Sequence, residues 1–469
     1  MNKSDIGLIG LGTMGAMLSL NIAEKGFAIS VFNRTVARVD SFVKGAGSLA
    51  SQITPARSLD EFVDTIAAPR AIIVMVPAGE AVDAQIAALR PLLNSDDLII
   101  DAGNANFHDT NRRAAEATAV GASYLGIGVS GGEDGARHGP SIMGGGDRSN
   151  WGRVAHIFDA IAAKYQGKPC ATWMGPGGAG HLVKTVHNGI EYADMQLIAE
   201  AYGVMRDGMN MTAPECGTVF GRWNRGILKS YLTEISAEVS NATDPTTGSP
   251  VLDIILDRAG QKGTGRWTVI ESQQTGAPVP VIEAAVAARN MSAELTTRHV
   301  GEDLFGGVPQ VLDRESLTLD DLEAALIVGK IMCYAQGFAL LARVGTAHGW
   351  ELPMSAIAET WREGCIIRSA MLNDMATALG EDPGRNLMFA PYFADLLRRN
   401  QAALRNVAAV AVAHGLPVPA MSAALGYFDT MRSARTTANM IQAQRDFFGA
   451  HSFERIDAQG SHHGPWGKA

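Results

Sequence analysis

The chain has 469 residues, with 39 Lys and Arg against 48 Asp and Glu, so its formal net charge at pH 7 is −9. This acidic balance argues against a general nucleic-acid binder and against a polybasic membrane-surface protein. A hydrophobic fraction of 46% excludes wholesale disorder, and at about 150 residues per domain the length predicts roughly two to four domains.

The first third of the chain alternates short apolar runs with helical patterns. A helix is expected at 14–25, and strands are expected at 5–9, 28–32, 71–76 and 98–101, with 124–130 and 141–144 as candidates to extend the same sheet. Strands that alternate with helices pair in parallel through right-handed crossovers. We therefore predict an α/β Rossmann-like domain over residues 1–178.

Beyond the glycine-rich segment 175–180, strand-like runs almost vanish and helical patterns dominate. Helices are expected at 181–207, 213–224, 280–298, 319–348 and 400–414. They predict a large all-helical domain over residues 179–440, which we expect to bind the substrate and to form a dimer interface. The pattern becomes polar from about residue 447, so a short C-terminal tail is expected over 441–469.

Cysteine usage and apolar runs bear on the compartment. The four cysteines lie far apart and form no CxxC pair, which predicts neither a zinc site nor a disulfide framework; they are Cys170, Cys216, Cys333 and Cys365. Uninterrupted apolar runs such as 71–77 are well short of the roughly 18 residues that a membrane helix needs, and the first residues lack a signal-peptide pattern. We expect a cytoplasmic protein that binds neither membrane nor metal.

Between the first expected strand and helix stands a glycine motif, Gly10-Leu11-Gly12-Thr13-Met14-Gly15. In such a motif the first glycine allows a tight turn, the second lets the backbone approach a pyrophosphate, and the third allows close packing of helix on sheet. The amides at the helix N-terminus are then available to the phosphates. A plain glycine turn is the alternative, but the strand–turn–helix context favours a dinucleotide site.

The residues after the second expected strand bear on the choice of dinucleotide. An NAD site usually has Asp or Glu there, about 20 residues beyond the glycines, to hold the ribose 2′-hydroxyl. This chain has Asn33, Arg34 and Thr35 instead. A carboxylate would repel a 2′-phosphate, whereas Arg34 can bind it through two hydrogen bonds. We predict NADP rather than NAD; the alternative is a solvated loop arginine.

Polar residues line one side of the first long helix of the second domain. His187, Asn188 and Glu191 follow Lys184 by three, four and seven residues, which puts all four on one stripe, and Tyr192 adds a hydroxyl nearby. A lysine and a carboxylate on a ligand-facing stripe can serve as base and acid. On spacing alone, the alternative of a solvated face with a Lys–Glu pair is favoured.

Two glycine-containing loops have groups that suit an anion. One is Ser130-Gly131-Gly132, and the other is 261–267, which includes Lys262 and Thr264. Exposed amides beside a cation suit a phosphate. The second loop lacks the spacing of a P-loop, so it does not indicate an NTPase. Each loop, taken alone, is equally typical of a tight turn.

Longer strings go beyond these generic patterns. They are GLGTMG, FNRT, GVSGGEDGARHGPSIM, GAGHLVKTVHNGIEYADMQ, AGQKGTGRWT, GCIIRS and IQAQRDFFGAH. In this order they resemble the 6-phosphogluconate dehydrogenase family, the decarboxylating enzymes of the pentose phosphate pathway. The resemblance extends from residue 5 to about residue 455, which is nearly the whole chain.

The resemblance implies oxidative decarboxylation of 6-phosphogluconate to ribulose 5-phosphate and CO₂, with reduction of NADP. It implies Lys184 as the general base and Glu191 as the general acid. For NADP it implies the glycine motif, Asn33–Thr35 and the turn formed by Val76, Pro77 and Ala78. For the substrate it implies Asn104, which also borders the cofactor, together with Ser130, Gly131, Gly132, His187, Asn188, Tyr192, Lys262, Thr264 and Arg289.

The resemblance also implies a homodimer in which the tail of one subunit completes the partner's site through Arg445 and His451. The chain departs from the family at Pro77, where many members have a lysine that can face the cofactor. The final residues, SHHGPWGKA, are only loosely similar, and we expect His462 and His463 to lie in a solvated tail without a catalytic role.

Burial, with nearby cations such as Lys262 and Arg289, is expected to favour the neutral form of Lys184 that a base requires. Two alternative functions are a β-hydroxyacid dehydrogenase resembling 3-hydroxyisobutyrate dehydrogenase, and a non-catalytic NADP-binding sensor. The first is typically much shorter and lacks AGQKGTGRW and QAQRDFFGAH, and the presence of both Lys184 and Glu191 argues against the second. The NADP/NAD ratio, assembly beyond a dimer, and a pentose phosphate or gluconate-degrading pathway remain open at this point.

Overall fold

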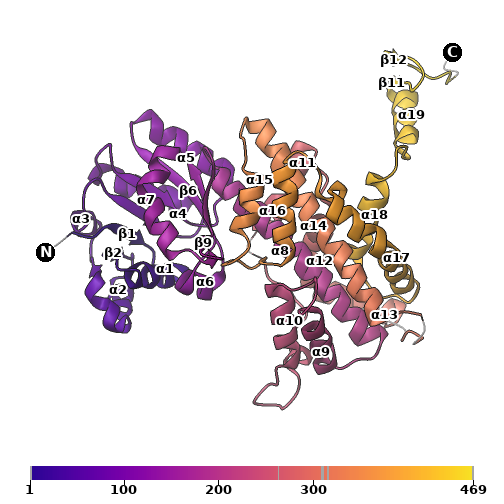
Figure 1. Ribbon diagram of the computed structural model, residues 1–469, viewed down its shortest axis with the longest axis horizontal. Coiled ribbons are helices and arrows are strands. Elements are labelled where there is room, and N and C mark those ends of the chain that lie inside the picture. Colours follow the sequence, from indigo (N-terminus) through magenta and orange to yellow (C-terminus); the bar gives the residue numbers. More distant parts are fainter. Residues whose placement is uncertain (1–2, 262, 308–310, 314–315, 467–469) are drawn as a thin grey trace. The chain divides into compact units, whose positions relative to one another are not determined.

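The computed structural model describes residues 3–261, 263–307, 311–313 and 316–466. The chain divides into two compact units, Met1–Ala424 and Leu425–Ala469. The first unit contains a sheet domain followed by a helical domain, and the second contains the end of one helix, a further helix and a small hairpin (Figure 1).

An eight-stranded sheet forms the N-terminal domain, in the order β10-β7-β6-β5-β4-β1-β2-β3. Its strands are β1 (Ile6–Ile9), β2 (Ile29–Phe32), β3 (Ile53–Pro55), β4 (Ala71–Val74), β5 (Leu98–Asp101), β6 (Ser123–Val129), β7 (Ile142–Gly146) and β10 (Ala171–Gly175). Neighbouring strands pair in parallel, except that β7 runs antiparallel to β6. The predicted Rossmann-like sheet is confirmed; β3 and β10 were not predicted. A separate hairpin joins β8 (Lys164–Tyr165) and β9 (Lys168–Pro169).

Alternating strand residues fill two hydrophobic cores, one on each face of the sheet. On one face, Leu8, Ile73 and Ile100 pack with α1 (Thr13–Glu24), α2 (Val36–Gly45) and α7 (Arg148–Ile161). On the other, Ile9, Ile72 and Ile99 pack with α3 (Leu59–Asp64), α4 (Glu80–Leu89) and α5 (Phe107–Ala119). Successive side chains point to opposite faces and helices cover both, which explains why these strands are apolar throughout. The short α6 (Gly132–His138) packs against α1.

The helical domain follows directly. Its helices are α8 (Ala179–Gly203), α9 (Ala213–Trp223), α10 (Tyr231–Asn241), α11 (Thr264–Thr275), α12 (Pro280–Ala293), α13 (Leu295–Phe305), α14 (Leu319–His348), α15 (Met354–Thr360), α16 (Met371–Glu381), α17 (Pro391–Ala413) and α18 (Pro419–Met431), which crosses into the second unit. A π-helical turn, η3 (Val204–Gly208), extends α8. Short 3₁₀ turns are η1 (Gly47–Gln52), η2 (Arg90–Leu92), η4 (Val251–Asp253) and η5 (Leu387–Phe389).

The central helix α14 packs against α8 and α17. By length and composition it is apolar enough to cross a membrane, with a mean hydropathy of 1.6 over its most apolar window, and no other helix in the described ranges passes that test. Inside the protein, 89% of that window is buried. A helix that is hydrophobic all round is expected in the core of a large domain, and α14 occupies that place here.

Two predicted helices differ from the observed ones. The helix expected at 280–298 starts at Pro280 as predicted, but its predicted end is wrong, because the chain leaves helical geometry at Glu294 and begins again as α13. The carbonyl of Ser292 there accepts a hydrogen bond of 3.2 Å from the guanidinium of Arg298, and the Ser292 hydroxyl bonds the backbone of Arg289 and Ala259. The helix expected at 400–414 starts earlier, at Pro391, a residue suited to the first turn of a helix.

The second unit is more ordered than a polar tail. Within it α19 (Ala438–Gly449) continues past residue 447, and β11 (Phe453–Glu454) pairs antiparallel with β12 (Ser461–His462). The predicted limit between domain and tail, at residues 440 and 441, falls inside α19.

Glycines on the sheet let α8 lie directly against it. A Cβ added to Gly180 would come within 2.7 Å of the Gly126 oxygen and the Gly145 nitrogen. A Cβ on Gly128 would contact the side chain of Lys184, with 3.0 Å to its Cγ. Larger residues at these positions would push the helix away, so this close approach brings Lys184 beside the end of β6.

Candidate active site

The candidate cofactor residues lie in loops that follow neighbouring parallel strands. Gly10–Gly15 follows β1, Asn33–Thr35 follows β2, Val76–Ala78 follows β4, and Asn104 follows β5. The carboxyl ends of parallel strands meet at one edge of the sheet, where ligands of this fold class bind. Two of these loops touch, since a Cβ on Gly103 would lie 3.2 Å from the backbone oxygen of Val76.

The glycine turn fits a dinucleotide pyrophosphate. Gly10 has a φ of 104°, and a Cβ there would lie 2.9 Å from the carbonyl carbon of Met75. The space beside Gly12 is open, with no atom within 4 Å of an added Cβ. α1 then begins at Thr13 and Met14 without a side-chain cap on its first amides. Open space beside uncapped amides at a helix N-terminus is what a bound pyrophosphate requires.

The loop after β2 joins the glycine turn to an exposed cation. Asn33 accepts a hydrogen bond of 3.1 Å from the amide of Leu11, which fixes the two loops together. Arg34 and Thr35 are exposed, and no partner for the Arg34 guanidinium occurs in the described residues. Arg38 is exposed one helical turn later on α2. Sequence reasoning did not single out Arg38, which lies four residues beyond Arg34 and inside α2, whereas Arg34 precedes that helix.

A buried polar cluster surrounds Lys184. Its amine donates a hydrogen bond of 2.9 Å to the Ser130 hydroxyl and lies 3.4 Å from Nδ1 of His187. The Ser130 hydroxyl also lies 3.2 Å from Nε2 of His187, whose Nδ1 is 3.2 Å from Oδ1 of Asn188. Lys184, His187 and Asn188 are 6%, 0% and 7% exposed. The alternative of a solvated polar face is therefore wrong.

Burial sets the protonation of this cluster. It lowers the pKa of Lys184 and lowers that of His187 well below its usual value, while it raises the pKa of Glu191. A carboxylate oxygen of Glu191 lies 3.8 Å from Nδ1 of His187. The neighbouring charge of Glu191 opposes the effect on Lys184, and Arg289 acts on Glu191 rather than on Lys184. Desolvation, not Arg289, is thus the cause that favours a neutral lysine.

Tyr192, Thr264 and Arg289 form a second group. The Arg289 guanidinium lies 3.6 Å from the centre of the Tyr192 ring and donates a hydrogen bond of 3.0 Å to the carbonyl of Gly260. The same ring lies against Gly265, where an added Cβ would come within 2.7 Å of it. Thr264 is buried at the start of α11, whose first amides have no side-chain cap. Lys262, predicted to belong to this group, lies outside the described residues.

The GCIIRS segment, residues 364–369, packs against the Ser130 loop, and sequence reasoning did not assign it this role. Gly131 has a φ of 104°, and a Cβ on it would lie 2.6 Å from the carbonyl oxygen of Gly364. That oxygen also accepts a hydrogen bond of 2.8 Å from the amide of Ser141. Cys365, the next residue, is buried close enough to Lys184 for the two to affect each other's pKa. Gly132 begins α6 with a φ of 63°.

A side-chain bridge ties the sheet domain to α11. Nε2 of His108, near the start of α5, lies 2.8 Å from a carboxylate oxygen of Glu271 on α11. Asn104 is exposed in the loop just before α5. The bridge therefore holds the helix that begins at Thr264 against the element that follows Asn104. Neither His108 nor Glu271 was predicted, because a half-exposed histidine and a helix glutamate carry no sequence signal of a contact across 163 positions.

Arg445 and His451 belong to the second unit, whereas the other candidates belong to the first. Both are exposed, and the Arg445 guanidinium bonds Gln442 on its own helix at 3.1 Å. Within the described ranges, no group of three or more His, Cys, Asp or Glu side chains is placed to hold a metal ion.

A glycine turn suited to a dinucleotide, together with a buried lysine on a helix of the second domain, indicates a two-domain dinucleotide-dependent oxidoreductase. Two family models match the chain: "NAD binding domain of 6-phosphogluconate dehydrogenase" over residues 5–175, and "6-phosphogluconate dehydrogenase, C-terminal domain" over residues 180–466. The chain belongs to the 6-phosphogluconate dehydrogenase family.

Full-length relatives agree with this assignment. The NADP(+)-dependent decarboxylating 6-phosphogluconate dehydrogenase of Bacillus subtilis is 45% identical, with 100% of both chains covered. The NAD(+)-dependent decarboxylating enzyme of the same organism is 43% identical, with 99% of both covered. The solved 6-phosphogluconate dehydrogenase of Plasmodium falciparum is 39% identical and has a TM-score of 0.95, covering 98% of this chain and 100% of its own. The predicted family and the two-domain fold are confirmed.

Proposed function

We propose that this protein oxidises and decarboxylates 6-phosphogluconate to ribulose 5-phosphate and CO₂, with reduction of NADP. The observation that carries the proposal is the Lys184 cluster, in which a buried amine of lowered pKa is bonded to Ser130 with Glu191 two helical turns away. The two Bacillus subtilis relatives support it, because both are called decarboxylating and are covered over 100% and 99% of their length.

The two titratable groups suit the two halves of the reaction. NADP, when bound, supplies the acceptor for the hydride that leaves C3 of the sugar acid. Neutral Lys184 takes the proton of the C3 hydroxyl, and the product is a 3-keto acid whose carboxylate is β to the new carbonyl. Protonated Lys184 then polarises that carbonyl, so that the electrons of the breaking C1–C2 bond can move toward it as CO₂ leaves.

Glu191 completes the sequence. Loss of CO₂ leaves an enediol, and its terminal carbon, which becomes C1 of ribulose 5-phosphate, must receive a proton while an enol hydroxyl loses one. Burial raises the pKa of Glu191, which favours the protonated form that can donate to that carbon, and Lys184 can take the proton from the hydroxyl. Two groups whose pKa values are displaced toward each other by burial suit an acid and a base at neutral pH.

We predict that Glu191→Gln lowers kcat by about 10²-fold or more while the KM for 6-phosphogluconate stays near the wild-type value. Glutamine keeps the size of the side chain and its hydrogen bonding but has no proton to transfer. Steady-state kinetics of the variant would measure both constants. A variant that retains more than about a hundredth of the wild-type kcat would show that another group supplies the proton.

The choice of NADP rests on Arg34. We predict that Arg34→Ala raises the KM for NADP much more than the KM for NAD, because a charged hydrogen bond to the 2′-phosphate contributes about 1.5–3 kcal/mol. Arg38→Ala, the neighbouring exposed arginine, is the matched comparison. Equal changes in the two KM values for Arg34→Ala would remove this residue from cofactor selection.

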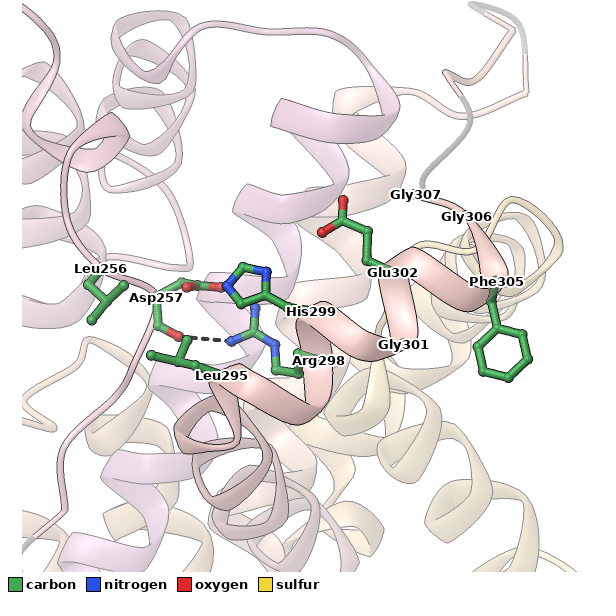
Figure 2. A pocket seen from close by; sticks show the side chains of 10 residues that line it. All are labelled: Leu256, Asp257, Leu295, Arg298, His299, Gly301, Glu302, Phe305, Gly306 and Gly307. Carbon is green, nitrogen blue, oxygen red and sulfur yellow. Dashed lines mark hydrogen bonds and ion pairs between the residues drawn. The ribbon is translucent and has the colours of Figure 1, made fainter.

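We also propose a homodimer in which Arg445 and His451 of one subunit complete the partner's substrate site. The exposed apolar surface of α13 in the helical domain supports the dimer. None of the described residues of α13 is buried, and Leu304 and Phe305 on it are 71% and 89% exposed. A groove of about 550 Å³ lies beside this helix. Figure 2 shows two of its lining residues, Leu256 and Leu295, near the Arg298–Asp257 ion pair. Apolar surface of this kind marks protein–protein contacts.

One assay separates the candidate functions. The purified protein is given 6-phosphogluconate with NADP or NAD, and reduced nicotinamide and released CO₂ are measured together. One CO₂ per reduced nicotinamide, with NADP preferred, is the expected result. Turnover of 3-hydroxyisobutyrate without CO₂ would favour a β-hydroxyacid dehydrogenase, and NADP binding without turnover of either acid would favour a sensor.

We further propose a cytoplasmic location and a role in a pathway that consumes phosphorylated sugar acids, either pentose phosphate or gluconate degradation. All four cysteines are free and buried, which suits a reducing compartment. The substrate and both products of the proposed reaction are those of such a pathway.

A further inference from the structure

One carboxylate organises the second unit. Asp446 on α19 is 3% exposed, and its two oxygens accept four hydrogen bonds. Oδ1 bonds the amide of Ser452 at 2.9 Å and Nδ1 of His463 at 2.6 Å. Oδ2 bonds the amide of Gly464 at 2.9 Å and the indole of Trp466 at 2.6 Å.

These bonds join two separate parts of the tail. Ser452 lies just after α19, where the chain reverses through two residues with positive φ, Ala450 at 50° and Ser452 at 58°. His463, Gly464 and Trp466 follow the β11–β12 hairpin. Positive φ is unfavourable for residues other than glycine and persists only where the surroundings hold it. The carboxylate therefore fixes the reversal and closes the hairpin over it.

The reversal sets the direction of His451. This residue stands between the two residues of positive φ, and its ring lies edge-on to Phe448, with 5.9 Å between ring centres. A Cβ on Gly449 would come within 2.5 Å of its Nε2. Arg445 is the residue before Asp446 on the helix. In the chain, Arg445 directly precedes the hydrogen-bonded Asp446 and His451 follows it by five residues.

The Asp446 carboxylate makes these hydrogen bonds in its ionised form. The amide of Gly464, with the Trp466 indole and His463 imidazole, holds the pKa of Asp446 well below its usual range, so the carboxylate stays ionised at physiological pH. Hydrogen bonds to an ionised acceptor are about twice as strong as neutral ones. His463 is 59% exposed, in keeping with the expected solvated tail, but its imidazole also bonds a carboxylate that sequence reasoning did not place near it.

We propose that Asp446 is a positioning residue, and that residues 463–466 act as a latch that closes on it and presents Arg445 and His451 together to the substrate bound by a second subunit. This rests on the proposed function and assigns a role to a segment that resembles the family only loosely. Preorganising the two side chains removes the cost of ordering them at the moment of binding.

The test compares Asp446→Asn, Trp466→Phe and His462→Ala. Asparagine is isosteric but uncharged, phenylalanine keeps the ring that packs on Phe447 and loses one donor, and His462 is a neighbouring histidine whose imidazole bonds Gln459 instead of Asp446. For Asp446→Asn we expect the KM for 6-phosphogluconate to rise about tenfold or more, with the KM for NADP unchanged. Trp466→Phe should give a smaller rise, and His462→Ala should match the wild type.

Hydrogen exchange supplies a readout that does not depend on activity. In Asp446→Asn the amides of Ser452 and Gly464 should lose protection, while those of α14 should keep it. Unchanged exchange at both amides, or an unchanged KM for 6-phosphogluconate, would overturn the proposal. If the wild-type protein fails to oxidise 6-phosphogluconate, the proposed function fails, and the exchange measurement still decides whether Asp446 closes the latch.

Discussion

Replacing Lys184 with alanine is expected to abolish oxidation of 6-phosphogluconate, with kcat reduced by about 10²–10⁴-fold. The amine is the buried base candidate that bonds Ser130, and the described residues nearest to it cannot replace it. Burial lowers the pKa of His187 well below its usual value, which makes it a weak base, and burial raises the pKa of Glu191, which favours its protonated form. Retention of more than about a hundredth of the wild-type kcat would contradict the role of base.

The role of Lys184 as the base also predicts the pH dependence of the wild-type enzyme. A base must be unprotonated, so kcat/KM should fall as the pH drops through the pKa of Lys184. Burial lowers that pKa below its ordinary value of 10.5, which moves the fall toward neutral pH. Lys184→Arg is the matched control because it keeps the positive charge and the stem but stays protonated at every accessible pH. We expect it to be inactive as well, and activity in Lys184→Arg would indicate that only charge is required.

The sequence was sufficient for the elements that depend on local pattern. The strand–glycine–helix start at Gly10 and the absence of a carboxylate at Asn33–Thr35 depend on residues close in sequence, and the sheet places them as predicted. The break at Glu294 was missed because it depends on Arg298 and Ser292 bonding across the helix end, which leaves no mark in helical periodicity.

The protonation of the site could not be predicted from spacing. On spacing alone, the stripe from Lys184 to Glu191 is better explained as a solvated face. Its burial depends on Gly128 of β6, which is 56 positions away from Lys184 and lets the helix approach the sheet. The bridge between His108 and Glu271 likewise joins two residues that are far apart in the sequence. Contacts between distant elements decide which polar residues lose water, and so decide which become base or acid.

Mixing two impaired variants is expected to restore activity if the tail acts between subunits. One variant is Lys184→Ala, and the other is Arg445→Ala, which lacks the guanidinium proposed to bind the substrate phosphate of the partner. The phosphate carries close to two negative charges, and a bidentate arginine contact with it is among the stronger hydrogen-bonded pairs. Arg445→Ala alone should therefore raise the KM for 6-phosphogluconate sharply.

In a heterodimer of the two variants, a tail that acts in trans puts both defects into one site and leaves the other site intact. About half of the wild-type activity per dimer should then return, with the wild-type KM. Two different affinity tags allow the heterodimer to be purified after reversible dissociation, and homodimers of each variant, treated identically, are the control. If Arg445 instead serves its own subunit, each site carries one defect and the verified heterodimer stays as impaired as the homodimers. That result would place the tail in its own subunit's site.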